Sequence, residues 1–333
     1  ATVLKLYDTY GFPVDLTADY ARERGLYLDM DGFEREMGAQ RDRGRAASRF
    51  GADYSAGLDV EGSTDFTGYE HLEDDSVITG LFRGGEPVER LSAGESGVVI
   101  LERTPFYAES GGQVGDTGSM AGDGFELEVM DTIKDPTGLI IHKARVTGGT
   151  IRQGDAVSLR VDGAKREATA LNHTATHILH AVLRQVLGDH VKQAGSRVAP
   201  DRLRFDFTHF SLIDNDALET IENLVNQRIR QNIPTDTAEM DAEDAFKSGA
   251  TALFEEKYGD RVRVVALSDF SRELCGGTHT AKTGNIGLFK IISESSVASG
   301  VRRIEALTGE AALDYTQQSI KILQETAHLI KET

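Results

Sequence analysis

Four side chains that can bind a metal ion occur in two pairs of identical spacing. His173 and His177 lie four residues apart, as do Cys275 and His279, and Cys275 is the only cysteine of the chain. A helix around the first pair would place both imidazoles on one face, one turn apart. The two glycines between Cys275 and His279 would let the backbone turn tightly. Three histidines and one cysteine suit Zn2+, so the sequence predicts one zinc ion per chain.

The spacing leaves other interpretations open. A single histidine pair is also typical of a solvated helix face, and it is the presence of two pairs on separate segments that favours a metal. Four protein ligands make a closed, structural zinc site, whereas three ligands and a water make an open, catalytic one, and spacing alone does not decide between them. His180 falls on the same helix face as His173, and we expect a surface histidine there rather than a support for a metal ligand. His190 and His209 have no spacing that indicates a role.

The elements that would position these residues alternate between helix and strand. Apolar residues at spacings of three and four predict a helix over Glu167–Leu187, which Gly188 would end. Alternating residues predict a β-hairpin over His190–Phe207. The remaining expected elements are a helix over Asp216–Gln231 and strands over Val262–Leu267 and Ile286–Ile292. Together they predict an α+β domain over residues 164–307.

The rest of the chain divides into three further segments. Residues 1–55 are expected to be helical. Residues 56–163 hold short alternating runs separated by glycine-containing turns, which predicts a small, glycine-rich β-barrel or sandwich. Residues 308–333 carry apolar side chains at heptad spacing, which indicates either the start of a coiled-coil or oligomerisation region or a single amphipathic helix packed on its own domain. The predicted fold class is therefore α+β, with helical segments at both ends.

Composition and charge exclude several classes of protein. No apolar stretch approaches the length of about 18 residues that a membrane span needs. One cysteine cannot form an internal disulfide, so we expect a cytoplasmic protein. The net charge of −18 argues against nucleic acid as a partner, and residues 59–131 alone hold 17 acidic and 3 basic side chains. Basic side chains nevertheless gather within residues 41–49 and 192–204, which are either ordinary solvated faces or places where phosphates bind.

Five motifs, taken in order, resemble one enzyme family. The segments 173–177 and 275–279 resemble the zinc motifs of the editing domain of alanyl-tRNA synthetases, and Ser110–Gly118 is similar to the glycine-rich motif of that domain. Leu6–Pro13 looks like the segment that closes the tRNA-recognition region, and Ser295–Ala306 looks like the end of the editing core. The resemblance covers nearly the whole chain and is bacterial in style. The chain lacks the class II aminoacylation domain of that family and most of its C-terminal oligomerising region, so we expect a fragment.

The resemblance implies an editing core of the threonyl/alanyl-tRNA synthetase type and catalytic roles for three side chains. Thr176 would meet the hydroxyl of a serine substrate, although its hydroxyl could instead bond a carbonyl one helical turn back. Gln193 would bond the substrate or the attacking water, the alternative being a surface glutamine. Arg302 and Arg303 would bind phosphate or the ribose end, and we expect Arg302 to be the one that points inward, because adjacent residues on a strand face opposite ways.

The glycine-rich motif is expected to contact the tRNA or the substrate. Gly111 and Gly112 would allow a tight turn near the tRNA 3′ end, and Gln113 follows them. No general base is evident in these motifs. Asp116 and Glu305 are the nearest candidates, and zinc or a ribose hydroxyl of the substrate could take the place of a protein base.

The implied activity is zinc-dependent hydrolysis of Ser-tRNA(Ala) and Gly-tRNA(Ala). An alanine pocket rejects glycine and serine poorly, because one methyl group or one small hydroxyl is worth little discrimination, so a second, hydrolytic site is needed. The parent enzyme would attach alanine to tRNA(Ala) with ATP, which this chain alone should not do, and would oligomerise through its C-terminal region. The alternative is a non-catalytic, tRNA-positioning module with a structural zinc. A free-standing editing factor is less favoured, because both ends of the chain look like junctions.

Overall fold

The computed structural model describes residues 63–135, 137–251 and 259–332, together with eleven residues between 17 and 33. The chain divides into two compact units, residues 1–53 and 54–333. In the first unit the described helical residues are 17, 20–22, 30, 32 and 33. The rest of the helical prediction for residues 1–55, the motif Leu6–Pro13 and the basic stretch 41–49 lie outside the described residues.

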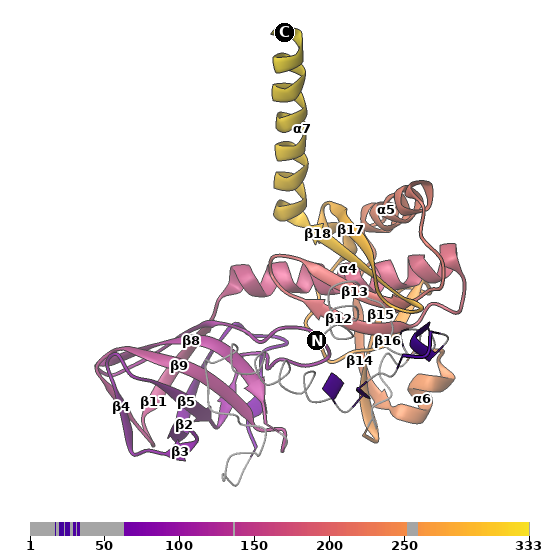
Figure 1. Cartoon of the computed structure of the whole chain (residues 1–333). Coiled ribbons are helices and arrows are strands. Elements are labelled where there is room, and N and C mark those ends of the chain that lie inside the picture. Colours follow the sequence, from indigo (N-terminus) through magenta and orange to yellow (C-terminus); the bar gives the residue numbers. More distant parts are fainter. Residues whose placement is uncertain are drawn as a thin grey trace. The chain divides into compact units, whose positions relative to one another are not determined.

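A closed β-barrel forms the first half of the second unit (Figure 1). Its six strands run antiparallel in the order β11-β7-β8-β9-β5-β2, and β2 pairs back with β11, so the sheet has no open edge. The strands are β2 (Glu73–Arg83), β5 (Ser96–Leu101), β7 (Gly118–Gly122), β8 (Phe125–Lys134), β9 (Ile140–Gly148) and β11 (Ala156–Val161). The same part of the chain also contains five short strands: β1 (Asp65–Phe66), β3 (Glu86–Pro87), β4 (Arg90–Ser92), β6 (Arg103–Thr104) and β10 (Thr150–Arg152). The predicted small barrel is thereby confirmed.

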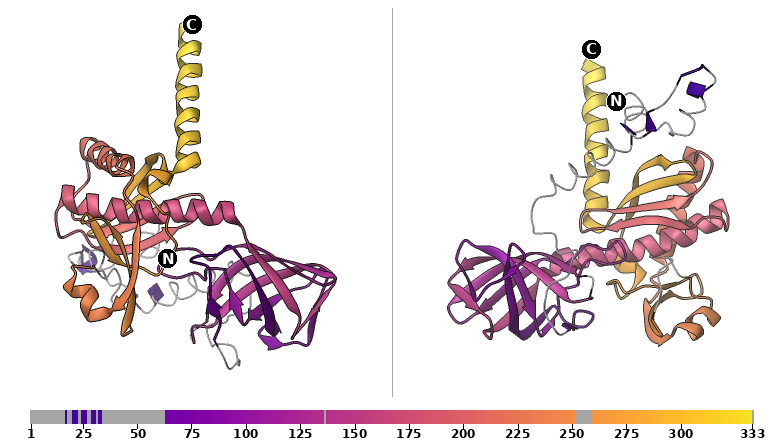
Figure 2. Two further views of the ribbon diagram at one scale, coloured as in Figure 1. Left: turned by 180° about the vertical axis from the view of Figure 1, so that it is seen from behind. Right: turned by 60° about the horizontal axis from the view of Figure 1, so that its bottom comes forward.

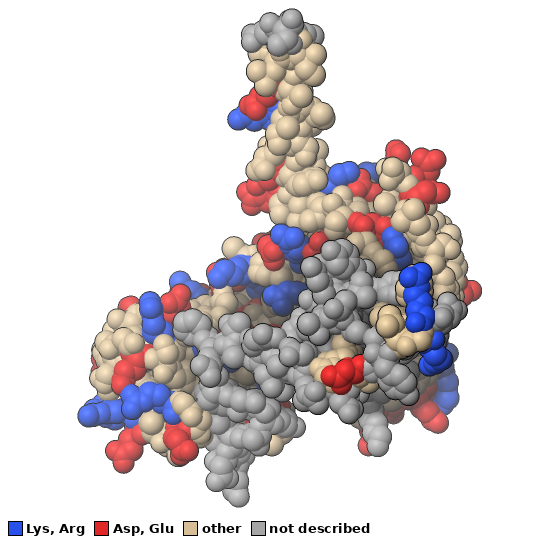
Figure 3. Space-filling view, in the orientation of Figure 1, with Lys and Arg blue, Asp and Glu red and all other residues tan. Residues whose placement is uncertain are grey.

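Alternation along the barrel strands separates an apolar interior from a charged exterior. Buried and exposed residues alternate strictly along β11, and its inward side chains join an interior cluster with those of the other strands. On the outside, acidic residues of the 59–131 segment pair with cations from later strands, as in Lys143–Asp131, Arg145–Glu128 and Arg160–Glu73. Figure 3 shows both charge signs on the barrel surface. The acidity of the sequence segment is therefore partly balanced within the barrel.

One histidine is enclosed in the barrel. His142 is completely buried, with Nδ1 3.0 Å from the carbonyl oxygen of Val99 and Nε2 2.8 Å from Oγ1 of Thr104. Because the carbonyl can only accept, Nδ1 carries the proton and Nε2 accepts from the hydroxyl. Burial lowers the pKa of His142 to about 4, so the ring is neutral at physiological pH.

The second half of this unit is the α+β domain that the sequence predicts. Helix α4 (Gly163–Leu187) and helix α5 (Asn215–Arg230) pack against one face of an antiparallel sheet of order β12-β13-β18-β17. The strands are β12 (Gln193–Val198), β13 (Leu203–Thr208), β17 (Phe289–Ala298) and β18 (Val301–Thr308). A second sheet, β14 (Asp236–Asp241), β15 (Arg261–Leu267) and β16 (Ser271–Leu274), carries helix α6 (Ala242–Lys247). Figure 2 shows the two sheets on opposite sides of α4.

Local sequence explains most of the element boundaries. Asp162 caps α4 by accepting from the backbone N–H of Lys165, which moves the start of the helix ahead of the predicted Glu167. The strand predicted over 286–292 is wrong at its start, because residues Thr283–Ile286 form a 3-10 helix, η2, and β17 begins at Phe289. The side chain of Asn226 on α5 fixes this start, since it bonds both the N–H and the carbonyl of Phe289.

The last helix, α7 (Gly309–Glu332), projects from the sheet (Figure 1). Most of its apolar heptad side chains are exposed, with Leu313 and Ile320 at 49% and Leu323 and Ile330 at 69%. Among the described residues, none of the helices is long and apolar enough to cross a membrane.

Candidate metal centre and its cavity

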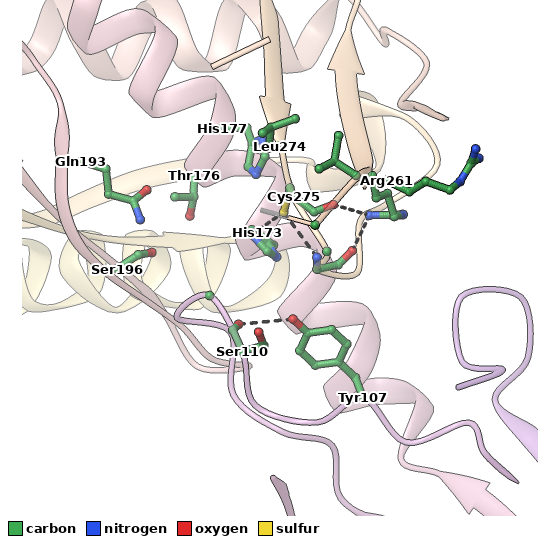
Figure 4. Close-up of a pocket in the computed structure, with 16 residues that line it drawn as sticks. Tyr107, Ser110, His173, Thr176, His177, Gln193, Ser196, Arg261, Leu274 and Cys275 are labelled. Atoms are coloured by element: carbon green, nitrogen blue, oxygen red, sulfur yellow. Dashed lines mark hydrogen bonds between the residues drawn. The ribbon is translucent and has the colours of Figure 1, made fainter. Parts of the chain in front are cut away.

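The four predicted ligands come together in one cluster. His173 and His177 project from one face of α4, and Cys275 lies on the loop after β16 (Figure 4). His279 follows on the same loop. One ligand atom from each of the four lies within 4.8 Å of the others. The Sγ atom of Cys275 is 3.5 Å from Nε2 of His173 and 3.3 Å from Nε2 of His279. The cluster therefore has the composition and the compactness of a site that can bind a metal ion.

Each imidazole has a partner for the nitrogen that faces away from the cluster. Nδ1 of His173 is 2.7 Å from Oε1 of Gln113, and Nδ1 of His279 is 3.1 Å from Oγ1 of Thr174. Nδ1 of His177 lies 2.9 Å from a carboxylate oxygen of Glu273. These acceptors hold the proton on Nδ1 and leave Nε2 free to bind a metal. Both ring nitrogens of His177 are buried without a hydrogen-bond partner among the described residues, so its contact with Glu273 is an ion pair and its Nε2 has no partner of either kind.

The charges of the cluster favour a thiolate. Burial alone would raise the pKa of the Cys275 thiol, but the imidazoles of His173, His279 and His177 hold it well below its ordinary value. Burial would likewise raise the pKa of Glu273, and the charge of His177 lowers it to about 2. For His177 burial acts to lower the pKa, and Glu273 and Cys275 raise it to about 10, so binding of a metal ion at Nε2 would release a proton from this ring. Burial lowers the pKa of His279 to about 3, so this ring is neutral and can ligate.

Glu273 supports two histidines at once. Its second carboxylate oxygen is 2.8 Å from Nδ1 of His180, and His180 is only 4% exposed. The expectation of a surface histidine at position 180 is therefore wrong, because this side of α4 faces β16 and not solvent. Glu273 itself was not singled out from the sequence. Its signal was its position two residues before the candidate ligand Cys275, on a strand that the sequence analysis did not predict.

Gln113 ties the barrel to the metal-ligand loop. Its side chain is completely buried, its Oε1 accepts from the backbone N–H of Thr278 at 2.9 Å, and its Nε2 donates to Oγ1 of Thr278 at 2.9 Å. The same Oε1 is the acceptor for His173. With its carboxamide engaged in this way, Gln113 orients a metal ligand and does not face the cavity, which differs from the expected contact with tRNA or substrate.

The turn between Cys275 and His279 is held from its outer side. The guanidinium of Arg263 donates from Nη1 to the carbonyl oxygens of Cys275 and Gly277, both at 2.9 Å, and stacks over the ring of Tyr69. The hydroxyl of Tyr69 donates to the carbonyl of Gly276. A Cβ at Gly277 would lie 2.0 Å from Cε1 of His173, so only glycine fits there. The sequence contained no signal for Arg263 or Tyr69.

Neither candidate for a general base is free. Asp116 forms a buried ion pair with Arg166, and one of its oxygens accepts from the backbone N–H of Tyr107. The same guanidinium donates to two carbonyl oxygens of the barrel, those of Gly68 and Pro105. Glu305 bonds the hydroxyl of Ser293 across two strands. Both carboxylates therefore support the fold.

A cavity of about 210 Å3 opens beside the cluster. Its walls include His173, His177 and Cys275, and also Thr176 and Gln193 (Figure 4). The other lining residues are Tyr107, Ser110, Gly111, Ser196, Gly259, Arg261, Val262, Arg263, Leu274, Gly276 and Gly277. No carboxylate is among these described lining residues, whereas hydroxyl, amide and backbone groups are.

Besides the candidate metal ligands, three of the expected site residues line the cavity: Thr176, Gln193 and Gly111. The hydroxyl of Thr176 donates to the carbonyl of Asn172, one turn back, and keeps its acceptor capacity. Gln193 is half-buried at the first position of β12. Gly111 lines the cavity, and Gly112 has φ of +87° with its backbone against that of Ser196, where a Cβ would lie 2.6 Å from a carbonyl oxygen.

The two expected phosphate ligands lie outside the cavity lining. Arg302 forms a two-pronged ion pair with Glu294, with N–O distances of 2.5 and 2.6 Å. Arg303 forms another with Asp206, at 2.7 Å for both contacts, and these bonds raise the pKa of Arg303. The two side chains do face opposite ways on β18, as alternation requires. Each has a carboxylate where a phosphate was expected, because antiparallel pairing brings those acids next to them.

Comparison with known proteins identifies relatives along the whole chain. Residues 1–165 match the family described as tRNA synthetases class II (A), and residues 262–305 match the family described as threonyl and alanyl tRNA synthetase second additional domain. Proteins named alanine–tRNA ligase from Desulfosudis oleivorans, Halorhodospira halophila and Methylococcus capsulatus are 53%, 56% and 55% identical to it over 99% of its length. The chain spans 38% of the length of each of these relatives.

Proposed function

Because this chain belongs to the alanyl-tRNA synthetase family, we propose that it is the editing part of such an enzyme and hydrolyses tRNA(Ala) mischarged with serine or glycine. The observation that carries this proposal is the histidine and cysteine cluster at the wall of a cavity that Thr176 and Gln193 also line. Such a cavity can bind the small aminoacyl ester at the 3′ end of a tRNA. The ATP-dependent joining of alanine to tRNA would belong to the longer protein and not to this chain alone.

The donor set fits a zinc ion. His173, His177, Cys275 and His279 would hold it, with Nε2 of His177 as the buried nitrogen that otherwise lacks a partner. Gln113, Thr174 and Glu273 accept from the outer nitrogens, which is the usual support of zinc-bound histidines. When bound, the ion would supply Lewis acidity toward the ester or its attacking water.

The cavity side chains would select the amino acid. The hydroxyl of Thr176 already donates to the carbonyl of Asn172, so its free lone pairs would accept from the hydroxyl of a serine substrate. Alanine offers no such donor and would leave those lone pairs unused, which is the physical basis for preferring serine over alanine; this contact does not distinguish glycine from alanine. The amide of Gln193 would orient the ester or the attacking water. Because none of the described lining residues is a carboxylate, a ribose hydroxyl of the substrate would take the place of a protein base.

We further propose the division of labour that the resemblance implies. Residues 1–55 would end a tRNA-recognition region, 56–163 would be the barrel, 164–307 the editing core and 308–333 the start of an oligomerisation region. Gly111 and Gly112 would approach the tRNA 3′ end, while Arg302 and Arg303 would reach it only by exchanging their carboxylate partners for phosphate. The protein would act in the cytoplasm.

The proposal is tested by measuring hydrolysis of Ser-tRNA(Ala), with Ala-tRNA(Ala) as the comparison substrate. We expect rapid loss of serine with alanine spared, and loss of activity in a Cys275→Ala variant or after chelation, restored by added zinc in the unchanged chain only. A folded, zinc-loaded protein that hydrolyses neither ester contradicts the proposal.

The number of protein ligands also fits a second function, that of a tRNA-positioning module with a structural zinc. Four protein ligands close a tetrahedral zinc site, which is typical of structural zinc. The chain would then position tRNA without catalysis. In that case chelation lowers thermal stability and tRNA binding, and no hydrolysis is present to be lost.

A further inference from the structure

Three aromatic rings form a surface away from the barrel, at the end of the β12–β13 hairpin. His190 and His209 are joined by a hydrogen bond of 2.9 Å between Nε2 and Nδ1, and their ring planes are within 23° of parallel. The ring of Phe210 lies within 22° of parallel to that of His190, with centroids 6.4 Å apart. We call these three residues the stacking platform. Local sequence patterns do not predict it, because His190 and His209 are 19 residues apart.

The platform is held in place although it is exposed. Phe210 is 85% exposed, which is unusual for a phenylalanine whose ring could be buried. The backbone N–H of His209 donates to the carbonyl of Gly300 in the neighbouring hairpin, at 2.9 Å. Gly300 leaves room for the ring, since a Cβ there would lie 3.1 Å from Phe210. Together with the two imidazoles, this ring offers an exposed, flat aromatic surface on which another planar group can stack.

The platform continues the wall of the cavity. Gln193, which lines the cavity, pairs in register with Phe207, three residues before Phe210. The hydroxyl of Thr208 joins the two strand ends, because it donates to the carbonyl of His190 at 2.7 Å and accepts from the backbone N–H of Lys192 at 3.0 Å. The hairpin therefore leads from a wall residue of the cavity to the platform over three residues, about 10 Å of extended chain.

We propose that the stacking platform binds an unpaired RNA base next to the terminal nucleotide of the substrate. This inference rests on the proposed function, which places a tRNA 3′ end in the cavity. A base presents a flat aromatic face, and near-parallel rings match that shape better than they match an irregular protein side chain. The exposed Lys192 supplies positive charge for an adjoining phosphate on an otherwise acidic protein.

The test is binding of an RNA hairpin that carries no amino acid and ends in a four-nucleotide single-stranded 3′ tail. A fluorescent 2-aminopurine in the tail reports stacking, and a blunt hairpin without the tail is the reference. We expect Phe210→Ala to weaken binding of the tailed hairpin at least about fivefold and to abolish the fluorescence change, as loss of one base–aromatic contact does. Phe210→Tyr, which keeps the ring, should bind within about twofold of the unchanged chain.

The matched control is Leu212→Ala. Leu212 is 76% exposed on the same loop but has no ring, so its removal should leave RNA binding unchanged. Equal effects of Phe210→Ala and Leu212→Ala, or an effect that does not need the tail, overturn the inference and indicate an apolar docking surface for protein. Unchanged binding in a folded Phe210→Ala protein also overturns it.

Hydrolysis separates this inference from the proposed function. If the chain binds the tailed RNA through Phe210 but hydrolyses no ester, the platform stands and the editing proposal fails. If it hydrolyses Ser-tRNA(Ala) and Phe210→Ala changes neither KM nor the RNA affinity, the editing proposal stands and the platform fails.

Discussion

Replacing Glu273 with glutamine should weaken zinc binding by roughly 10- to 100-fold, or about 1.4 to 2.7 kcal/mol. The carboxylate is 4% exposed, and its two oxygens lie 2.9 Å from Nδ1 of His177 and 2.8 Å from Nδ1 of His180. A carboxylate accepts from both nitrogens, whereas a carboxamide offers one oxygen and one NH2 group. The Nδ1 of one imidazole would then face the NH2 group, and that ring would have to move its proton from Nδ1 to Nε2. If the ring is that of His177, the proton would occupy the nitrogen that binds the metal.

Zinc affinity can be measured by competition with a chromophoric chelator. The matched control is Glu239→Gln, an exposed glutamate on β14 of the same three-stranded sheet, which should leave the affinity unchanged. Thermal melting of the zinc-free proteins separates a loss of affinity from a loss of folding. An affinity of Glu273→Gln within about twofold of the unchanged chain would refute the claim that Glu273 holds His177 in its metal-binding form.

Three further predictions concern folding and the ligand turn. Stability to urea should fall by about 3 kcal/mol between pH 6.5 and pH 4, because His142 takes up a proton in the unfolded chain at pH 6.5 but in the barrel only at about pH 4. His142→Gln should flatten that slope, and an unchanged slope contradicts the assignment. Gly277→Ala should abolish zinc binding, since its Cβ would overlap a cluster imidazole, whereas Gly276→Ala, with 3.8 Å of space, should not. Arg166→Ala should cost about 3 to 5 kcal/mol of unfolding free energy by leaving the buried Asp116 unpaired, and a loss under 1 kcal/mol in urea titrations would exclude this.

Local patterns were sufficient to predict most of the barrel strands and the long helices, but not β14, α6 or β16. The strict alternation along β11 and the three-and-four spacing along α4 each reflect one buried face, so the barrel and the long helix follow from the sequence. The start of β17 did not, because Asn226, distant in sequence, holds the backbone of Phe289. Sequence alone contains no record of such a contact.

The candidate ligands were also predictable, because metal binding requires a few residue types at short spacing. His173 and His177 share a helix face by geometry, and the lone cysteine with a histidine four residues later completes the set. The identity of the cluster residues can therefore be predicted from short segments of the sequence. That the two pairs meet depends on how β16 packs against α4.

Only the tertiary structure decided which side chains serve the cluster and which are committed elsewhere. The candidate ligands are supported by contacts with Gln113 and Glu273, and Glu273 also contacts His180. By contrast, the charge of Asp116 is paired with a residue 50 positions away, and that of Arg302 with a residue 8 positions away. A polar group takes its role from the partner that burial and strand register bring to it, because an unpaired buried charge is too costly to keep. The residue types set what chemistry is available, and the packing of barrel, helix and sheets determines where it is used.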